Sequence, residues 1–226
     1  MSESIKIDIW SDIACPWCYI GKRKFEAGAA AFADKAGASA PDVTIEYHSF
    51  ELAPDTPVDF AGSEIDFLAT HKGMPADQVR GMLDHVTGIA EASGLDYHFD
   101  TLQHTNTVKA HQLLHYAKAR GLQVEAKERL LRAYFTEGKH VGRIDDLADL
   151  GAEIGLDRTD IVRSLSEDEY LDDVRADQAL GVEYGIQGVP FFVIDGKYGV
   201  SGAQEAATFT QVLDQVWTER TEGAQV

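Results

Sequence analysis

The stretch Cys15-Pro16-Trp17-Cys18 holds the only two cysteines of the 226-residue chain. Residues 5–10, Ile-Lys-Ile-Asp-Ile-Trp, alternate apolar and polar side chains, which is typical of a half-buried strand. Residues 18–32 have apolar or small side chains at three- and four-residue steps, which predicts a helix. Pro16 then takes the first helical position, where its missing N–H costs nothing, and Cys15 becomes the residue that caps the helix.

The predicted position of Cys15 has a chemical consequence. The first turn of a helix has unpaired N–H groups and a partial positive charge, and both favour a thiolate over a thiol. A thiolate is the species that attacks a disulfide, so we expect Cys15 to be the nucleophile. Cys18, one turn further along, can resolve the mixed disulfide. The pair can therefore cycle between dithiol and disulfide without backbone rearrangement.

Three other interpretations of the cysteine pair stay open. A structural disulfide across so short a loop would remove little entropy from the unfolded chain. A zinc site needs about four ligands, so two of the eight histidines would have to converge on the pair. Two buried, unreactive cysteines are the third alternative. The strand, the proline and the helix together favour redox chemistry.

Residues 11–21, Ser-Asp-Ile-Ala-Cys-Pro-Trp-Cys-Tyr-Ile-Gly, resemble the active-site segment of the DsbA-like thioredoxin-fold oxidoreductases. The similarity is strongest to their FrnE-like branch, which is related to 2-hydroxychromene-2-carboxylate isomerases and kappa-class glutathione transferases. Residues 185–194 resemble that family's cis-proline loop and the strand after it. The resemblance implies that the Val189–Pro190 bond is cis and faces the cysteines, so that the Val189 backbone can pair with an extended substrate segment. A trans proline at the start of an edge strand is the alternative.

Other side chains receive expectations of their own. Pro16 lies beside the thiolate, so we expect it to tune the reduction potential of the pair. Trp17 either shares that role or binds substrates as a partly exposed aromatic residue. His111 and His115 have a spacing that can bind a metal, but no third ligand is evident. We expect them to be ordinary residues of a helix face and predict no metal.

Composition narrows the classes of partner. The formal net charge of −18 argues against nucleic acid and anionic membranes, which select for basic surfaces. No basic stretch followed by an apolar one opens the chain, and no apolar run is long enough to span a bilayer. We therefore expect a cytoplasmic protein, and in that compartment a close cysteine pair is usually catalytic, redox-sensing or metal-binding.

Three blocks of secondary-structure signals follow one another along the chain. Residues 5–50 read as strand, helix and strand, and the two strands are expected to be parallel and joined by a right-handed crossover. Residues 63–184 show only helical signals. The runs 191–194 and 198–201 predict a hairpin, because Asp-Gly lies between them, and a last helix is expected over 205–220.

Together with the resemblance, this order predicts an α/β thioredoxin-like fold with a large inserted all-helical domain. We expect residues 1–60 and 186–226 to form a discontinuous thioredoxin-like domain and residues 61–185 to form the insertion. The polar tail, residues 222–226, is expected to fray.

The sequence therefore predicts a thiol–disulfide oxidoreductase that acts on protein or low-molecular-weight thiols through Cys15 and Cys18. It would need no metal or organic cofactor, although glutathione, mycothiol or a thioredoxin must recycle the pair. A glutathione-dependent isomerase or transferase is the first alternative, but the resemblance implies serine in those enzymes at the position of Cys15. A non-enzymatic, redox-responsive binding protein is the second alternative.

Overall fold

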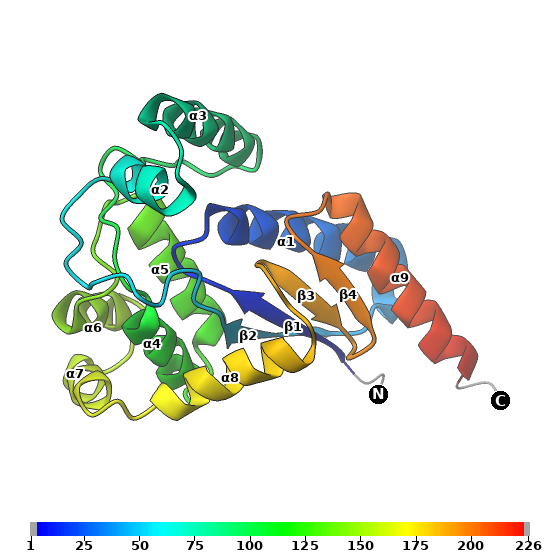
Figure 1. The fold of residues 1–226 in the computed structure, drawn as a ribbon. Helices are drawn as coiled ribbons and strands as arrows, with labels where there is room; N and C mark the ends of the chain where they lie inside the picture. The colour runs from blue at the N-terminus through cyan, green and yellow to red at the C-terminus, as the bar shows by residue number, and fades with distance from the viewer. Residues whose placement is uncertain (1–3, 224–226) are drawn as a thin grey trace.

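A four-stranded mixed sheet lies at the centre of the computed structural model, which describes residues 4–223 (Figure 1). The strand order is β2-β1-β3-β4, with the bounds Ile5–Ser11 for β1, Val43–Ser49 for β2, Phe191–Ile194 for β3 and Tyr198–Ser201 for β4. As predicted, β1 and β2 are parallel, and β3 and β4 form an antiparallel hairpin. β3 also pairs antiparallel with β1, which places the hairpin beside the strand that leads to the cysteines.

Helices cover both faces of the sheet because side chains alternate along β1. Ile5, Ile7 and Ile9 pack into a core with α1 (Pro16–Ala36) and α9 (Ala206–Gly223). Trp10 points to the opposite face, where its indole N–H donates to the Asp177 carbonyl at 2.9 Å. Asp177 belongs to α8 (Leu171–Glu183), so α8 covers this second face.

All the helices from α2 to α8 lie between β2 and β3 in the sequence, as expected for an insertion. Their bounds, apart from α8, are Glu64–Lys72 (α2), Ala76–Ala92 (α3), Val108–Lys118 (α4), Gln123–Phe135 (α5), Ile144–Glu153 (α6) and Arg158–Ser166 (α7). A single apolar core joins most of these helices to Ile13, which precedes α1, and to Tyr19 and Ile20 in its first turns. Figure 1 shows α2 and α3 as a separate arm above the N-terminal end of α1.

The predicted thioredoxin-like fold with its helical insertion is confirmed. The domain boundaries at residues 60 and 185 stay a prediction, although α8, which lies inside the predicted insertion, packs on the sheet. Of the tail that was expected to fray, Glu222 and Gly223 continue α9, and residues 224–226 lie outside the described residues. Among residues 4–223, no helix combines the length and the apolar character that crossing a membrane requires.

Candidate active site

The cysteine motif forms the first turn of α1, at the end of the central strand β1. Cys15 is the N-cap, with extended φ and ψ of −96° and 111°, and Pro16 follows as the first helical residue, as predicted. The Cys18 N–H donates to the Cys15 carbonyl at 3.0 Å, which closes this turn. Both side chains are thiols with only 3% of each residue exposed. The two sulfurs therefore lie one turn apart at the positive end of the helix.

The loop before β3 faces the motif. The Val189–Pro190 peptide bond is cis, as the resemblance implied. The Cys15 thiol donates a hydrogen bond to the Val189 carbonyl, with 3.6 Å between sulfur and oxygen. Gly21 makes this approach sterically possible, since a Cβ at that position would lie 2.9 Å from Cγ of Pro190. A residue with no side chain, one turn after Cys18, thus allows the loop to lie against α1.

Asp12 anchors the segment between β1 and the motif. It is 1% exposed, and its carboxylate accepts hydrogen bonds from the backbone N–H of Ile13 at 2.7 Å and of Leu52 at 2.8 Å. Nε2 of His111 lies 3.2 Å from the same carboxylate. Burial opposes ionisation, but the hydrogen bonds from His111 and Leu52 outweigh it and hold the pKa of Asp12 below its usual range. Asp12 therefore carries a buried negative charge three residues before Cys15.

Lys127 on α5 is a buried lysine that interacts electrostatically with both sulfurs. The residue is fully buried, and its ammonium nitrogen has no hydrogen-bond partner among the described residues. The nitrogen lies over the Tyr47 ring, 5.5 Å from its centroid. Burial lowers the pKa of Lys127, although the negative charges that Cys18 and Asp12 can carry oppose that shift. An ammonium in this place stabilises a thiolate in the pair.

Neighbouring groups shift the pKa values of the two thiols in opposite directions. Burial raises the pKa of the Cys18 thiol, but a hydrogen bond from Cys15 and the Lys127 ammonium outweigh it and lower the pKa overall. The pKa of Cys15 is raised by its hydrogen bond to Cys18, by burial and by the Asp12 carboxylate. The helix N-terminus therefore does not decide alone which sulfur is ionised. These directions favour Cys18 over Cys15 as the sulfur that ionises first.

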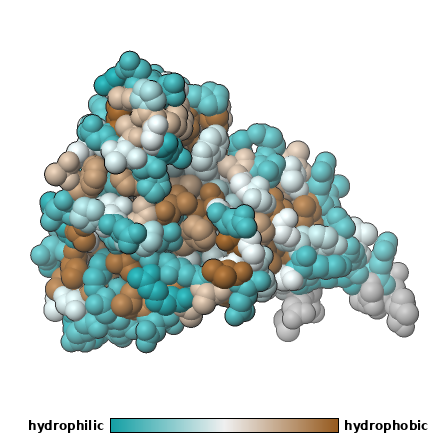
Figure 2. Space-filling model, in the orientation of Figure 1, coloured by the Kyte–Doolittle hydropathy of each residue, from teal (hydrophilic) through white to brown (hydrophobic). Residues whose placement is uncertain are grey.

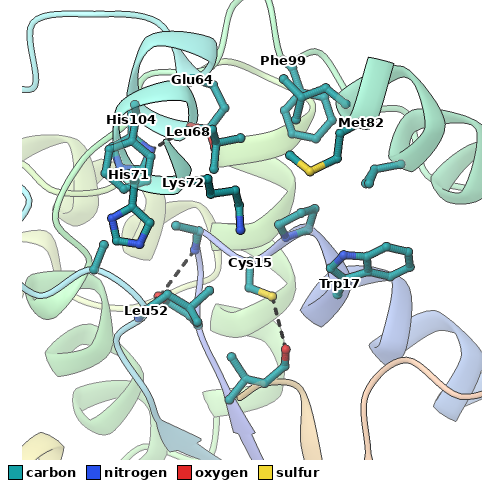
Figure 3. A pocket seen from close by; sticks show the side chains of 18 of the residues that line it. Cys15, Trp17, Leu52, Glu64, Leu68, His71, Lys72, Met82, Phe99 and His104 are labelled. Atoms are coloured by element: carbon teal, nitrogen blue, oxygen red, sulfur yellow. Dashed lines mark hydrogen bonds and ion pairs between the residues drawn. The ribbon is translucent and has the colours of Figure 1, made fainter. Parts of the chain in front are cut away.

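A cavity of about 470 Å³ opens above Cys15 (Figure 3). It lies under α2 and α3, and its floor includes Cys15, Pro16, Trp17 and Val189. Cys18 and Pro190 do not line it. The two sulfurs therefore differ in accessibility, because a molecule in the cavity contacts Cys15 and not Cys18.

The predicted site residues therefore come together as one unit. Trp17 lies at the rim with 38% of its surface exposed, and Pro16 is held by a 2.7 Å hydrogen bond from the Tyr97 hydroxyl to its carbonyl. His111 and His115 both lie on α4, and both are buried and paired, His111 with Asp12 at 3.2 Å and His115 with Asp177 at 3.1 Å. The expectation that they bind no metal stays a prediction.

Sequence reasoning assigned no role to Asp12, Tyr97 or Lys127. A signal for His111 was present, since it shares the apolar face of its helix with Leu114, where a polar side chain needs a buried partner. Lys127 offered no such signal, because it is far from the cysteines along the sequence and only the fold brings it near them.

One group of potential metal ligands occurs within residues 4–223, and it lies away from the cysteines. Asp8, Glu46 and His48 have ligand atoms within 4.8 Å of one another. The Lys6 ammonium already lies 2.8 Å from each of the two carboxylates. His48 is further held by Asp177, at 2.7 Å from Nδ1. These contacts are those of an ion-pair network between neighbouring strands and α8.

Comparison with known proteins places the chain in a family. The family model described as DSBA-like thioredoxin domain matches residues 6–214. The crystal structure of a probable DsbA oxidoreductase, SCO1869 from Streptomyces coelicolor, is 39% identical, with 95% of this chain and 91% of that chain covered and a TM-score of 0.86. The uncharacterized protein YwbO of Bacillus subtilis is 28% identical over 214 residues, which cover 93% of this chain and 96% of that protein.

A structure of 2-hydroxychromene-2-carboxylate isomerase shares the fold at 16% identity, with a TM-score of 0.71 and coverage of 96% of this chain and 98% of that chain. The resemblance read from residues 11–21 and 185–194 is thereby confirmed over nearly the whole chain. With its cysteine pair, its cis-proline loop and a family match from residue 6 to residue 214, this chain belongs to the DSBA-like thioredoxin domain family.

Proposed function

We propose that the protein is a thiol–disulfide oxidoreductase that exchanges a Cys15–Cys18 dithiol or disulfide with protein or low-molecular-weight substrates. One observation carries the proposal: the Cys15 sulfur lies at a helix N-terminus, lines a cavity and faces the Val189 carbonyl, with a second sulfur one turn behind it. A structural disulfide or an unreactive pair requires neither the cavity nor the facing loop.

The reduction of a substrate disulfide takes two steps. Starting from the dithiol, Cys15 gives its proton to solvent, and the Cys15 thiolate attacks one sulfur of the substrate, forming a mixed disulfide and releasing the other half as a thiolate. Cys18 then loses its proton, which the released thiolate can take, and attacks the Cys15 sulfur, so that the second half of the substrate leaves as a thiolate and takes a proton from solvent. The protein ends with a Cys15–Cys18 disulfide, and the substrate ends as two thiols. The reverse sequence oxidises a dithiol substrate.

The electrostatics of the site suit both steps. The Lys127 ammonium and the first turn of α1 stabilise the thiolate that forms or leaves in each step. The backbone of Val189 offers hydrogen bonds to an extended substrate segment once such a segment replaces the Cys15 contact. We assign Pro16 to the tuning of the pair and Trp17 to substrate contact at the rim.

Electrons must reach the pair from another molecule, since the chain has only these two cysteines. We therefore propose that a cellular thiol such as glutathione or mycothiol, or a thioredoxin, recycles Cys15 and Cys18. A reducing compartment such as the cytoplasm supplies these partners, which is the basis for proposing that the protein acts there.

Two variants test this function. Cys15→Ser is expected to abolish insulin reduction, while Cys18→Ser is expected to accumulate a mixed disulfide on Cys15 that mass spectrometry detects. Sustained turnover by Cys15→Ser contradicts the proposal. Tight, non-covalent binding of glutathione to the reduced protein, measured by calorimetry, would favour the transferase alternative instead.

A further inference from the structure

We infer that the cavity above Cys15 binds the body of a small disulfide that is mainly apolar and carries one carboxylate, so that such compounds, and not proteins, are the preferred substrates. This inference rests on the proposed thiol–disulfide exchange. It adds the class of substrate, which the cysteine pair alone does not specify.

The size and the lining of the cavity favour a small apolar body. Its volume of about 470 Å³ falls within the usual range for small-molecule sites. Phe67 and Leu68 from α2 and Met82 and Val86 from α3 line it, while Phe99 closes one side. Figure 2 shows apolar surface between this arm and the rest of the molecule, within a largely hydrophilic face. A folded protein could reach Cys15 along the Val189 edge, but it would leave this apolar space unfilled.

Charge favours a carboxylate on that body. Of the described residues lining the cavity, Lys72 is the only lysine or arginine. Its side chain is exposed and has no hydrogen-bond or ion-pair partner within residues 4–223. Figure 3 shows its side chain extending from α2 toward the floor, where Cys15 lies. The two carboxylates of the lining, Asp12 and Glu64, are each paired with a histidine. Lys72 therefore offers an unpaired positive charge to an anionic group.

His104 forms part of the polar wall of the cavity. It lines the cavity, is 5% exposed and stacks on Phe67 with 3.5 Å between ring centroids. Its Nδ1 donates to the Glu64 carboxylate at 2.7 Å, while its buried Nε2 has no partner among residues 4–223. The contact with His104 occupies the Glu64 carboxylate, so Glu64 does not neutralise Lys72 across the cavity.

The reaction balances without another cofactor. The Cys15 thiolate attacks the nearer sulfur of a symmetric disulfide held in the cavity, and one half of the compound leaves as a thiolate. Cys18 displaces the second half. The substrate gains two electrons and two protons, the cysteine pair becomes a disulfide, and a dithiol such as dithiothreitol restores it in an assay.

The test compares three disulfides in single turnovers with the reduced protein. Dithiobis(nitrobenzoate) is aromatic and carries one carboxylate on each half, dithiobis(nitropyridine) is neutral and of similar size, and bis(hydroxyethyl) disulfide is small and aliphatic. Lys72→Gln is expected to lower the ratio of the first rate to the second about fivefold. Lys35→Gln, a surface lysine on α1 paired with Asp214, is the matched control and should leave that ratio unchanged.

A second variant tests the apolar part of the site. Met82→Trp adds bulk to the lining and is expected to lower the ratio of either aromatic rate to the aliphatic rate about tenfold. Ratios unaffected by both variants, or insulin reduced more efficiently than the aromatic disulfides, would overturn the inference while Cys15-dependent exchange still stands. If the unaltered protein reduces none of the disulfides, the proposed function itself fails.

Discussion

Replacing Lys127 by methionine is the sharpest perturbation of the redox centre. Methionine has nearly the length of lysine without its charge, and the ammonium nitrogen makes no hydrogen bond that the change would break within the described residues. The variant therefore removes one buried positive charge from beside the sulfurs and alters the packing little. Any change in the thiol chemistry can then be attributed to electrostatics.

The size of the effect follows from the role of the ammonium. An opposite charge within about 4–6 Å typically lowers the pKa of an acid by about 1–3 units. Losing Lys127 should raise the pKa of Cys18 by that amount, which corresponds to about 1.4–4 kcal/mol of lost thiolate stabilisation. Since about 30 mV corresponds to 1.4 kcal/mol in a two-electron couple, the reduction potential should fall by about 30–90 mV. The variant is therefore expected to be the stronger reductant.

Two measurements check this prediction. Equilibration with glutathione buffers gives the reduction potential, and a pH titration of the ultraviolet absorbance of the thiolate gives the pKa of the pair. Lys139→Met is the matched control, because it removes the charge of a surface side chain that is 45% exposed. The reduction potential of this variant should not change. A Lys127→Met potential within the error of the unaltered protein, together with an unshifted titration, would refute the electrostatic role of Lys127.

The Lys127→Met change should also affect the stability of the fold, and it should raise it. Because burial lowers the pKa of Lys127 in the folded state, the unfolded chain binds its proton more tightly, and the charged side chain destabilises the fold at neutral pH. Lys127→Met is therefore expected to raise the midpoint of thermal unfolding. A lower midpoint would mean that the ammonium has stabilising contacts and would remove the basis for attributing the potential shift to charge alone.

Three further changes test other parts of the structure. Gly21→Ala places a Cβ against Pro190 and should cost about 1–3 kcal/mol in urea unfolding and slow insulin reduction, whereas Gly88→Ala, which has open space, should do neither. Burial opposes protonation of His48, yet the flanking carboxylates raise its pKa to about 9. Protonated His48 should therefore add up to about 3 kcal/mol to the free energy of unfolding below pH 6.5, and this contribution should vanish as the pH rises toward 9. His48→Gln should flatten that pH profile. Burial also opposes ionisation of Glu128, but its basic partners lower its pKa to about 2. Protonating Glu128 between pH 5 and pH 2 should therefore lower the free energy of unfolding by about 1–2 kcal/mol, and Glu128→Gln should lack this part of the acid destabilisation.

Local sequence patterns determined much of the fold and of the redox pair. Alternation predicted β1 and the β3–β4 hairpin, and the proline after Cys15 predicted the start of α1. These features depend on residues near one another in the chain, where backbone geometry and side-chain periodicity act directly. The identity of the two sulfurs and the loop at Pro190 followed from the sequence for the same reason, with the family resemblance adding the cis bond.

The tertiary structure alone decided the environment of those sulfurs. Lys127, 109 residues after Cys18, acts on the pair only because α5 packs against the start of α1. The pairing of Asp12 with His111 and the roof that α2 and α3 place over Cys15 likewise join segments far apart in the sequence. Electrostatic stabilisation and cavity shape depend on distances in space, and a pattern along the chain carries no record of them.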